Sequence, residues 1–191
     1  MLKALDEIDK SISKKVHHFD LGTIGSYIIF AFAWMYNKPP QMLIWLTYTY
    51  FMTFDKLVVM KLLIFQIVGV TITLFLKKTI ARERPFTAKE GEDPFSDGKS
   101  SHLRKKESNK SMPSGDSCQA AIFAAFARIN LGQNFWPIVM LLAMYGRVYY
   151  RCHFVGDTIV GATIGYLLVT LLNDYIFLIV EIGFMILEWY E

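Results

Sequence analysis

The sequence predicts an all-α protein: a bundle of six transmembrane helices with a short interfacial amphipathic helix at the N-terminus. Hydrophobic residues make up 53% of the 191 residues, and the mean hydropathy is +0.32, more than a soluble domain of this size usually shows. The apolar residues form long runs with few charges, interrupted by one long polar stretch at residues 77–115. We interpret residues 1–191 as a single integral membrane domain.

The first twenty residues predict the interfacial helix. Apolar residues recur there at three- and four-residue steps, and most lysines lie elsewhere on the helical wheel, a pattern typical of a helix lying on a membrane surface. The alternative is a solvated helix packed on the protein's own loops. No cleavable signal peptide is expected, because the segment is charged and lacks a long apolar core. His17 and His18 are interpreted as polar interfacial residues without chemistry.

Six apolar runs are expected to cross the membrane. They cover residues 21–36, 41–54, 57–76, 117–129, 135–145 and 159–180. Several approach the roughly 20 residues that a helix needs to cross hydrocarbon. The second and fourth are shorter and are included because crossings must be paired. With six crossings, the polar segments beside the third to sixth spans share one membrane face, opposite both termini.

Three short blocks on that face carry the residue types that phosphate chemistry needs. In chain order the blocks are Lys77-x6-Arg84-Pro85, Pro113-Ser114-Gly115-Asp116 and Arg147-x5-His153-x3-Asp157. Each residue alone has a simpler explanation, since cations at the end of a span usually reach toward lipid headgroups. Unrelated residues would be scattered between the two faces, so their convergence favours a functional site.

The first and third blocks supply cations, and the second supplies a helix N-terminus. Arg84 and Arg147 can each bind phosphate oxygens with two N–H groups, and Lys77 adds a point charge. Ser114 and Gly115 are expected to begin a helix, where backbone N–H groups and the helix dipole favour an anion.

His153 and Asp157 are four residues apart and share a face if that segment is helical. The carboxylate can hold one imidazole N–H and leave the other nitrogen free as a nucleophile. We expect the two side chains within hydrogen-bond reach, at about 2.6–3.2 Å. A satisfied pair within a helix is the simpler explanation for a His-x3-Asp pattern alone.

The three blocks together resemble the signatures of the type 2 phosphatidic acid phosphatases. These are the lipid phosphate phosphatases, which are related in fold to the vanadium haloperoxidases. The resemblance covers residues 77–157, and the helical layout extends it along the chain. It implies metal- and cofactor-independent hydrolysis of a lipid phosphate or diphosphate through a phosphohistidine intermediate. The roles it implies are phosphate binding by Lys77, Arg84, Ser114, Gly115 and Arg147, attack by His153, and orientation of His153 by Asp157.

Two positions depart from the family pattern. Gly146 stands where the family usually has a serine, at the expected cost of one hydrogen bond. Asp116 stands where the family has a catalytic histidine that protonates the leaving oxygen. A carboxylate beside three cations stays ionised at neutral pH, so it cannot donate that proton, and it repels a phosphate. His102, in the polar stretch, is another imidazole that could supply the proton, although a surface role is the simpler interpretation.

The sequence therefore leaves two functions open. One is a weakened enzyme acting on a membrane lipid phosphate or diphosphate, by hydrolysis or by transfer to an alcohol. The other is an inactive scaffold with the phosphatase fold, such as an accessory subunit bound to other membrane proteins. Nucleic acid is not an expected partner, because the basic residues lack interleaved aromatics. The organelle stays open between the endoplasmic reticulum, another internal membrane and, for a complex subunit, the mitochondrial inner membrane.

Overall fold

The computed structural model describes residues 2–36, 39–85 and 110–190. These residues form seven helices and no strand, so the all-α prediction is confirmed. The helices are α1 (Leu2–His18), α2 (Gly22–Trp34), α3 (Pro39–Thr53), α4 (Lys56–Ile80), α5 (Gly115–Asn130), α6 (Trp136–Tyr149) and α7 (Val155–Tyr190). In the described part of the chain, only α4 and α7 are long and apolar enough to cross a membrane unaided, over Lys56–Ile80 and Val155–Ile186.

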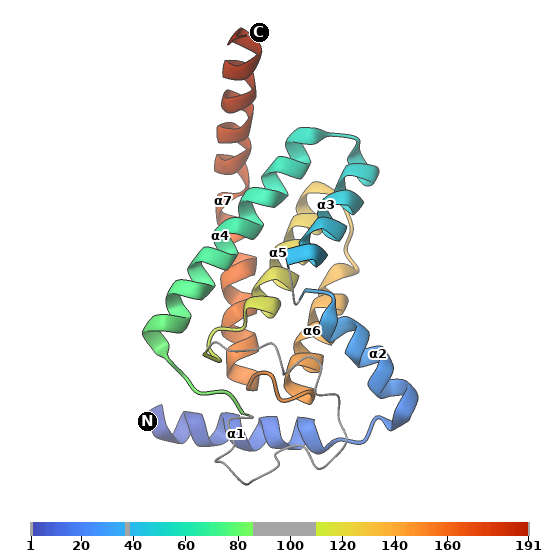
Figure 1. Ribbon diagram of the computed structural model, residues 1–191, viewed down its shortest axis with the longest axis vertical. Coiled ribbons are helices and arrows are strands. Elements are labelled where there is room, and N and C mark those ends of the chain that lie inside the picture. The colour runs from blue at the N-terminus through green and yellow to red at the C-terminus, as the bar shows by residue number, and fades with distance from the viewer. Residues whose placement is uncertain (1, 37–38, 86–109, 191) are drawn as a thin grey trace.

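The first two expected spans correspond to two short helices that together cross the bundle once. α2 and α3 have 13 and 15 residues, each short of the roughly 20 needed to cross hydrocarbon, and they follow one another in the same direction (Figure 1). Near the start of α2, the Ser26 Oγ lies 3.0 Å from the Tyr149 hydroxyl at the end of α6. In α3, the Tyr48 hydroxyl donates to Gln133 in the α5–α6 connection, at the opposite end. The structure therefore does not support six separate spans.

This shared passage changes the position of the N-terminus. α1 runs across the same end of the bundle as the three blocks, whereas the C-terminus lies at the opposite end (Figure 1). The expectation that both termini lie opposite the blocks is wrong for the N-terminus. The reason is that α2 and α3 together replace two crossings with one.

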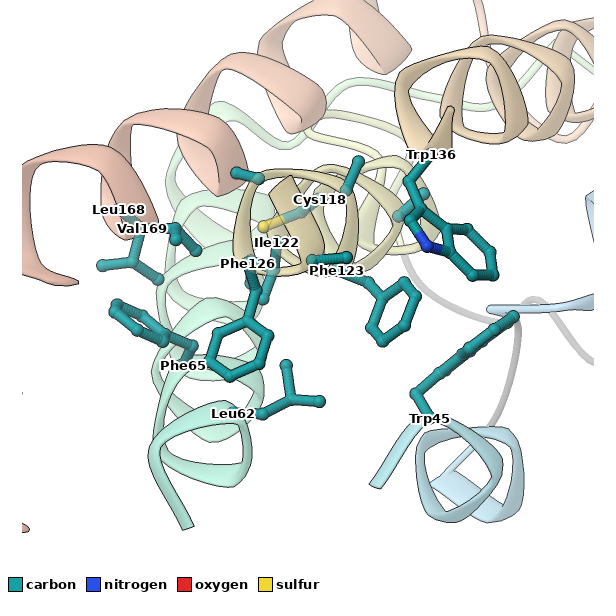
Figure 2. Packing of buried hydrophobic residues seen from close by; sticks show 14 of the residues in the cluster. Trp45, Leu62, Phe65, Cys118, Ile122, Phe123, Phe126, Trp136, Leu168 and Val169 are labelled. Carbon is teal, nitrogen blue, oxygen red and sulfur yellow. The ribbon is translucent and has the colours of Figure 1, made fainter. Parts of the chain in front are cut away.

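α5 forms the centre of the bundle. Every side chain from Ser117 to Ala127 is buried, and many of these residues are alanines, which let neighbouring helices approach. Phe123 and Phe126 extend from α5 toward aromatic rings of α3, α4 and α6 (Figure 2). The core thus combines close backbone packing on one side of α5 with large rings on the other.

Two glycines of α7 allow the closest of these approaches. A Cβ atom at Gly161 would lie 2.2 Å from the Ser114 carbonyl oxygen, and one at Gly165 would lie 2.2 Å from that of Cys118. Any side chain at either position would separate α5 from α7. The first of these contacts fixes the start of α5 against the start of α7, where the second and third blocks meet.

α1 packs on the bundle through polar residues. The Asp9 Oδ1 accepts a hydrogen bond from the Gly156 N–H at 2.8 Å, and the Ser13 Oγ accepts one from the Val155 N–H at 2.9 Å. These two N–H groups belong to the first turn of α7, where no residue of the same helix can accept them. The apolar side chains Leu5 and Ile8 remain 55% exposed. α1 therefore caps α7 with its polar stripe and leaves its apolar stripe uncovered by the described chain.

Candidate active site

His153 has its two ring nitrogens held in different environments. Its Nε2 lies 3.3 Å from the Arg84 Nη1, and because a guanidinium can only donate, Nε2 must be the acceptor. Its Nδ1 lies 3.4 Å from the Ser111 Oγ, which in turn donates to the Asp157 Oδ2. The proton of the neutral ring is therefore on Nδ1. This arrangement puts the lone pair of the ring on Nε2, where it accepts from Arg84.

Asp157 contacts His153 less directly than the sequence predicts. The His153 Nδ1 and the Asp157 Oδ2 are 3.7 Å apart, beyond the expected 2.6–3.2 Å. The difference arises because the Ser111 hydroxyl and the Phe154 N–H both donate to that same carboxylate oxygen. The other oxygen, Oδ1, accepts from the Arg82 Nη1 at 2.8 Å. The fully buried carboxylate is thus bonded on both oxygens.

Lys77 and Arg84 converge on the same backbone segment. The Lys77 Nζ donates to the carbonyl oxygen of Lys110 at 2.7 Å, and the Arg84 Nη2 reaches that oxygen at 3.4 Å. The Arg84 Nη1 also donates to the Cys152 carbonyl at 2.7 Å. α4 ends at Ala81 in a left-handed conformation, with φ of 52°, which turns the chain back over the bundle. This turn brings Arg84 to His153.

Arg147 and Asp116 form a salt bridge inside the site. The Arg147 Nη2 lies 2.7 Å from the Asp116 Oδ2, and only 1% and 16% of the two side chains are exposed. The carbonyl oxygen of Arg147 also accepts from the Cys152 and His153 N–H groups. The backbone of Arg147 therefore lies directly beside that of His153. A buried cation needs a partner such as Asp116, because an unpaired one would carry a large desolvation penalty.

The second block begins α5 at the same place. Ser114 is the N-cap residue, and its Oγ accepts from the Ser117 N–H at 3.3 Å. Its own N–H donates to the Asp157 carbonyl at 2.9 Å. Gly115 follows as the first helical residue, so the positive end of the α5 dipole faces the cluster. The structure thus brings the three blocks together at one end of the bundle.

Gly146, the other departure from the family pattern, has a packing role. A Cβ atom there would lie 2.8 Å from the Ala33 Cβ and 2.9 Å from the Ile29 carbonyl oxygen. α2 therefore lies directly on α6 at this point, one residue before Arg147. Glycine is the residue that this approach allows, and a serine would push the two helices apart.

Several residues near the cluster were missed by the sequence analysis. Arg82 binds three carboxylates: the Asp6 Oδ1 at 2.7 Å, the Asp9 Oδ2 at 2.8 Å and Asp157. Ser111 connects Asp157 to His153. Arg82 lies inside the first block and Ser111 just before the second, and these positions were the signal that could have identified them. The signal for the α1 residues was a polar stripe repeating at three- and four-residue steps. His102 lies outside the described residues.

The fold and the cluster define a helical membrane protein with a buried His–Asp pair surrounded by cations. The model of the PAP2 superfamily matches residues 58–180, well over half of the chain, and the chain belongs to this superfamily. The family prediction is confirmed.

Two solved structures share the fold. One is a transmembrane PAP2-type phosphatidylglycerolphosphate phosphatase from Bacillus subtilis, with 22% identity and a TM-score of 0.67, covering 90% of this chain and 86% of that one. The other is LpxE from Aquifex aeolicus, with 20% identity and a TM-score of 0.68, covering 86% of this chain and 94% of that one. A comparison with curated protein sequences gives no match. At these identities the structural likeness establishes the fold alone.

Proposed function

We propose that this chain hydrolyses phosphate or diphosphate from a membrane lipid, through a phosphohistidine formed on His153. The single observation that carries the proposal is the hydrogen-bond arrangement of His153. Its Nε2 is the acceptor nitrogen and lies 3.3 Å from the Arg84 guanidinium. A phosphate that accepted this Arg84 N–H in place of Nε2 would release the Nε2 lone pair and lie next to it. Membership of the PAP2 superfamily supports the same reaction class.

The reaction has two steps. In the first, the His153 Nε2 attacks phosphorus, and the bond from phosphorus to the lipid oxygen breaks. Positive charge develops on the imidazole, and the buried Asp157 stabilises it through Ser111. Lys77, Arg84 and the N–H groups at the start of α5 would hold the phosphoryl oxygens, which gather charge in the transition state. In the second step, water attacks the phosphohistidine and releases inorganic phosphate.

Asp116 argues for a substrate with a good leaving group. As the carboxylate partner of Arg147, it is ionised and has no proton to donate. Protonation of a leaving group is typically worth about 10²–10⁴-fold in rate. The leaving group of a lipid diphosphate is a lipid monophosphate, which is stable and needs little of this help. The leaving group of a lipid monophosphate is an alkoxide. This reasoning favours lipid diphosphates over monophosphates at any site that lacks another proton donor.

The second candidate function, an inactive scaffold, is favoured by the same salt bridge. The Asp116 carboxylate holds Arg147 at 2.7 Å, as a bound phosphate oxygen would. A family member that uses its own carboxylate in this way could keep the fold stable without a substrate. Such a protein would serve as an accessory subunit of a membrane complex. It would bind lipid phosphates weakly and would not turn them over.

Phosphate release by the purified full chain in detergent distinguishes the two functions. The substrates are a lipid monophosphate and an isoprenoid diphosphate, and the matched control is His153→Ala. The enzyme should release phosphate from the diphosphate at a rate well above that of the control, and EDTA should not change it. Equal release by both proteins would favour the scaffold. Loss of activity with EDTA and its return with Mg²⁺ would overturn the metal-free reaction.

A further inference from the structure

A cavity of about 220 Å³ lies between α1 and the α6–α7 connection, and a histidine lines it from each side. His153 lies on the bundle side, and His17 lies on α1. A group bound in this cavity would lie between the two residues. The expectation that His17 has no chemistry was based on its position in an exposed amphipathic segment. In the structure only 3% of the residue is exposed.

One hydrogen bond determines the protonation of His17. Its Nδ1 lies 2.7 Å from the backbone carbonyl oxygen of Tyr149. A carbonyl oxygen can only accept, so Nδ1 carries a hydrogen atom in either charge state of the ring. The nitrogen that gains and loses a proton is therefore Nε2. His17 has the chemistry of a proton donor and acceptor with a fixed tautomer.

The position of His17 is set by contacts that do not involve the imidazole. The Asp9 and Ser13 side chains bind the first N–H groups of α7, and His17 lies one turn beyond Ser13 on the same face of α1. Asp9 also binds Arg82 at 2.8 Å. α1 is thus anchored beside His153 by two hydrogen bonds and by the ion pairs of Asp6 and Asp9 with Arg82, and these hold His17 over the end of α6.

The charged residues around this cavity favour an anionic group within it. The other titratable residues that line it are Lys10, Lys14 and His18 on α1 and Arg151 on the α6–α7 connection. Among the described residues, no Asp or Glu lines the cavity, although Lys10 is paired with Asp6 at 2.6 Å outside it. A phosphate ester bound against His153 would offset these cations. It would also favour the protonated form of the neighbouring His17.

We propose that His17 is the general acid of this site, an inference that rests on the proposed phosphatase function. In the first step, the His153 Nε2 bonds to phosphorus, and the departing oxygen keeps the electron pair of the broken bond. That oxygen takes the proton from the His17 Nε2. In the second step, a water oxygen bonds to phosphorus, the bond to the His153 Nε2 breaks, and the His17 Nε2 takes the proton from the water. Phosphate leaves, and both histidines return to their starting states.

The proposal explains how a site with an ionised Asp116 could still hydrolyse a lipid monophosphate. The proton comes from an N-terminal helix that carries none of the three sequence blocks. Asp116 then acts on charge alone, as the partner of Arg147. The preference for diphosphates that Asp116 implies is correspondingly reduced.

The test compares two substrates that differ in how much their leaving group needs a proton. The substrates are phosphatidic acid, whose leaving group is an alkoxide, and p-nitrophenyl phosphate, whose leaving group is stable without a proton. The variant His17→Gln keeps an N–H donor for the Tyr149 carbonyl but cannot transfer a proton. The matched control is Lys15→Gln, an exposed position on the same helix. Turnover is measured on the full chain in detergent, with His153→Ala as the baseline.

His17→Gln should lower turnover of phosphatidic acid by about 10²–10⁴-fold, and the rate of the initial p-nitrophenol release, which reports the first step alone, by less than tenfold. The second substrate also reports whether the variant is folded. Equal losses on both substrates would show a structural role and overturn the proposal, and so would unchanged turnover of phosphatidic acid. If the unmodified chain does not exceed His153→Ala on either substrate, the proposed function fails, and the role of His17 fails with it.

Discussion

The Asp116 carboxylate lies 2.7 Å from the guanidinium of Arg147, and both side chains are largely buried. The pair places a negative charge where the family has a histidine. It stabilises a buried cation, and under the proposed function it would compete with phosphate for that cation. We therefore expect stability and activity to depend on this contact in opposite directions.

Replacing Asp116 with Asn separates these two effects. The melting temperature should fall, because Arg147 loses its charged partner in a buried place. The value of kcat/KM should rise about tenfold for monophosphates and diphosphates alike, since a repulsive charge is removed. Inorganic phosphate should raise the melting temperature of the variant more than that of the unmodified chain. A larger gain on monophosphates with Asp116→His than with Asp116→Asn would mean that a missing proton donor limits the enzyme.

Arg82 should control kcat through Asp157. The Arg82→Ala variant leaves the buried Asp157 without its 2.8 Å cationic partner, so the carboxylate should orient His153 poorly. We expect kcat to fall about 10–100-fold with little change in KM, measured with a lipid diphosphate. Arg82→Lys should recover part of the loss. Lys78→Ala, an exposed cation near the end of α4, is the control, and an equal effect there would contradict the specific role of Arg82.

The contact between Gly161 and Ser114 should be among the contacts of the bundle that tolerate substitution least. A methyl group at position 161 would meet the Ser114 carbonyl at 2.2 Å, so Gly161→Ala should separate α5 from α7. We expect a lower melting temperature and loss of activity. Gly183→Ala is the matched control on the same helix, because nothing lies within 4 Å of its added methyl group. That variant should be neutral or stabilised by up to about 1 kcal/mol.

The binding of α1 to the bundle should persist in mild acid and weaken in strong acid. The hydrogen bond from Lys10, the largest influence, together with the Arg82 ion pair, lowers the pKa of Asp6 below its ordinary value of 3.8, against a smaller opposing effect of burial. Lys10 lies on α1 itself, so only the part of this lowered pKa that Arg82 causes stabilises binding. That part acts above the ordinary pKa and is lost as pH falls below it. The protection of α1 amides from hydrogen exchange, measured against the intrinsic rate at each pH, should therefore stay high at pH 5 and fall below about pH 3.8.

The control for this pH dependence is Asp6→Asn. That variant should show faster exchange in α1 at pH 5, because one of the three carboxylates on Arg82 is gone. It should also show a smaller change on further acidification. If the unmodified chain and the variant respond identically to pH, Asp6 does not contribute to binding of the helix.

The helical content and the convergence of the three blocks could be predicted from the sequence, but the path of the chain could not. α4 and α7 are recognisable from length and apolarity alone. For α2 and α3, two apolar runs of moderate length separated by Pro39-Pro40 are compatible with a reversal or with a continuation in the same direction. Proline marks a helix boundary without setting the direction of the next helix. The number of crossings and the position of α1 both depended on that choice.

Within the site, the sequence predicted the residues whose spacing is characteristic and missed those that meet only in three dimensions. Arg82 was one of many cations in a polar stretch, and nothing in its spacing connects it to α1. The stripe of Asp6, Asp9, Ser13 and His17 is readable, but the apolar stripe of the same helix dominated the interpretation. The predicted contact between His153 and Asp157 was too short, because a hydroxyl from a different segment lies between them.

The length of α7 has a consequence for the surrounding bilayer. Its 36 residues extend about 54 Å at 1.5 Å per residue, against a hydrocarbon core of roughly 30 Å. Its first turn is fixed by α1 and by the start of α5, so the excess length lies entirely at the other end, where Ile179 is 64% exposed and Met185 59%. Hydrophobic mismatch is therefore absorbed by the C-terminal turns. A thicker bilayer would cover more of these turns and leave His153 where it is.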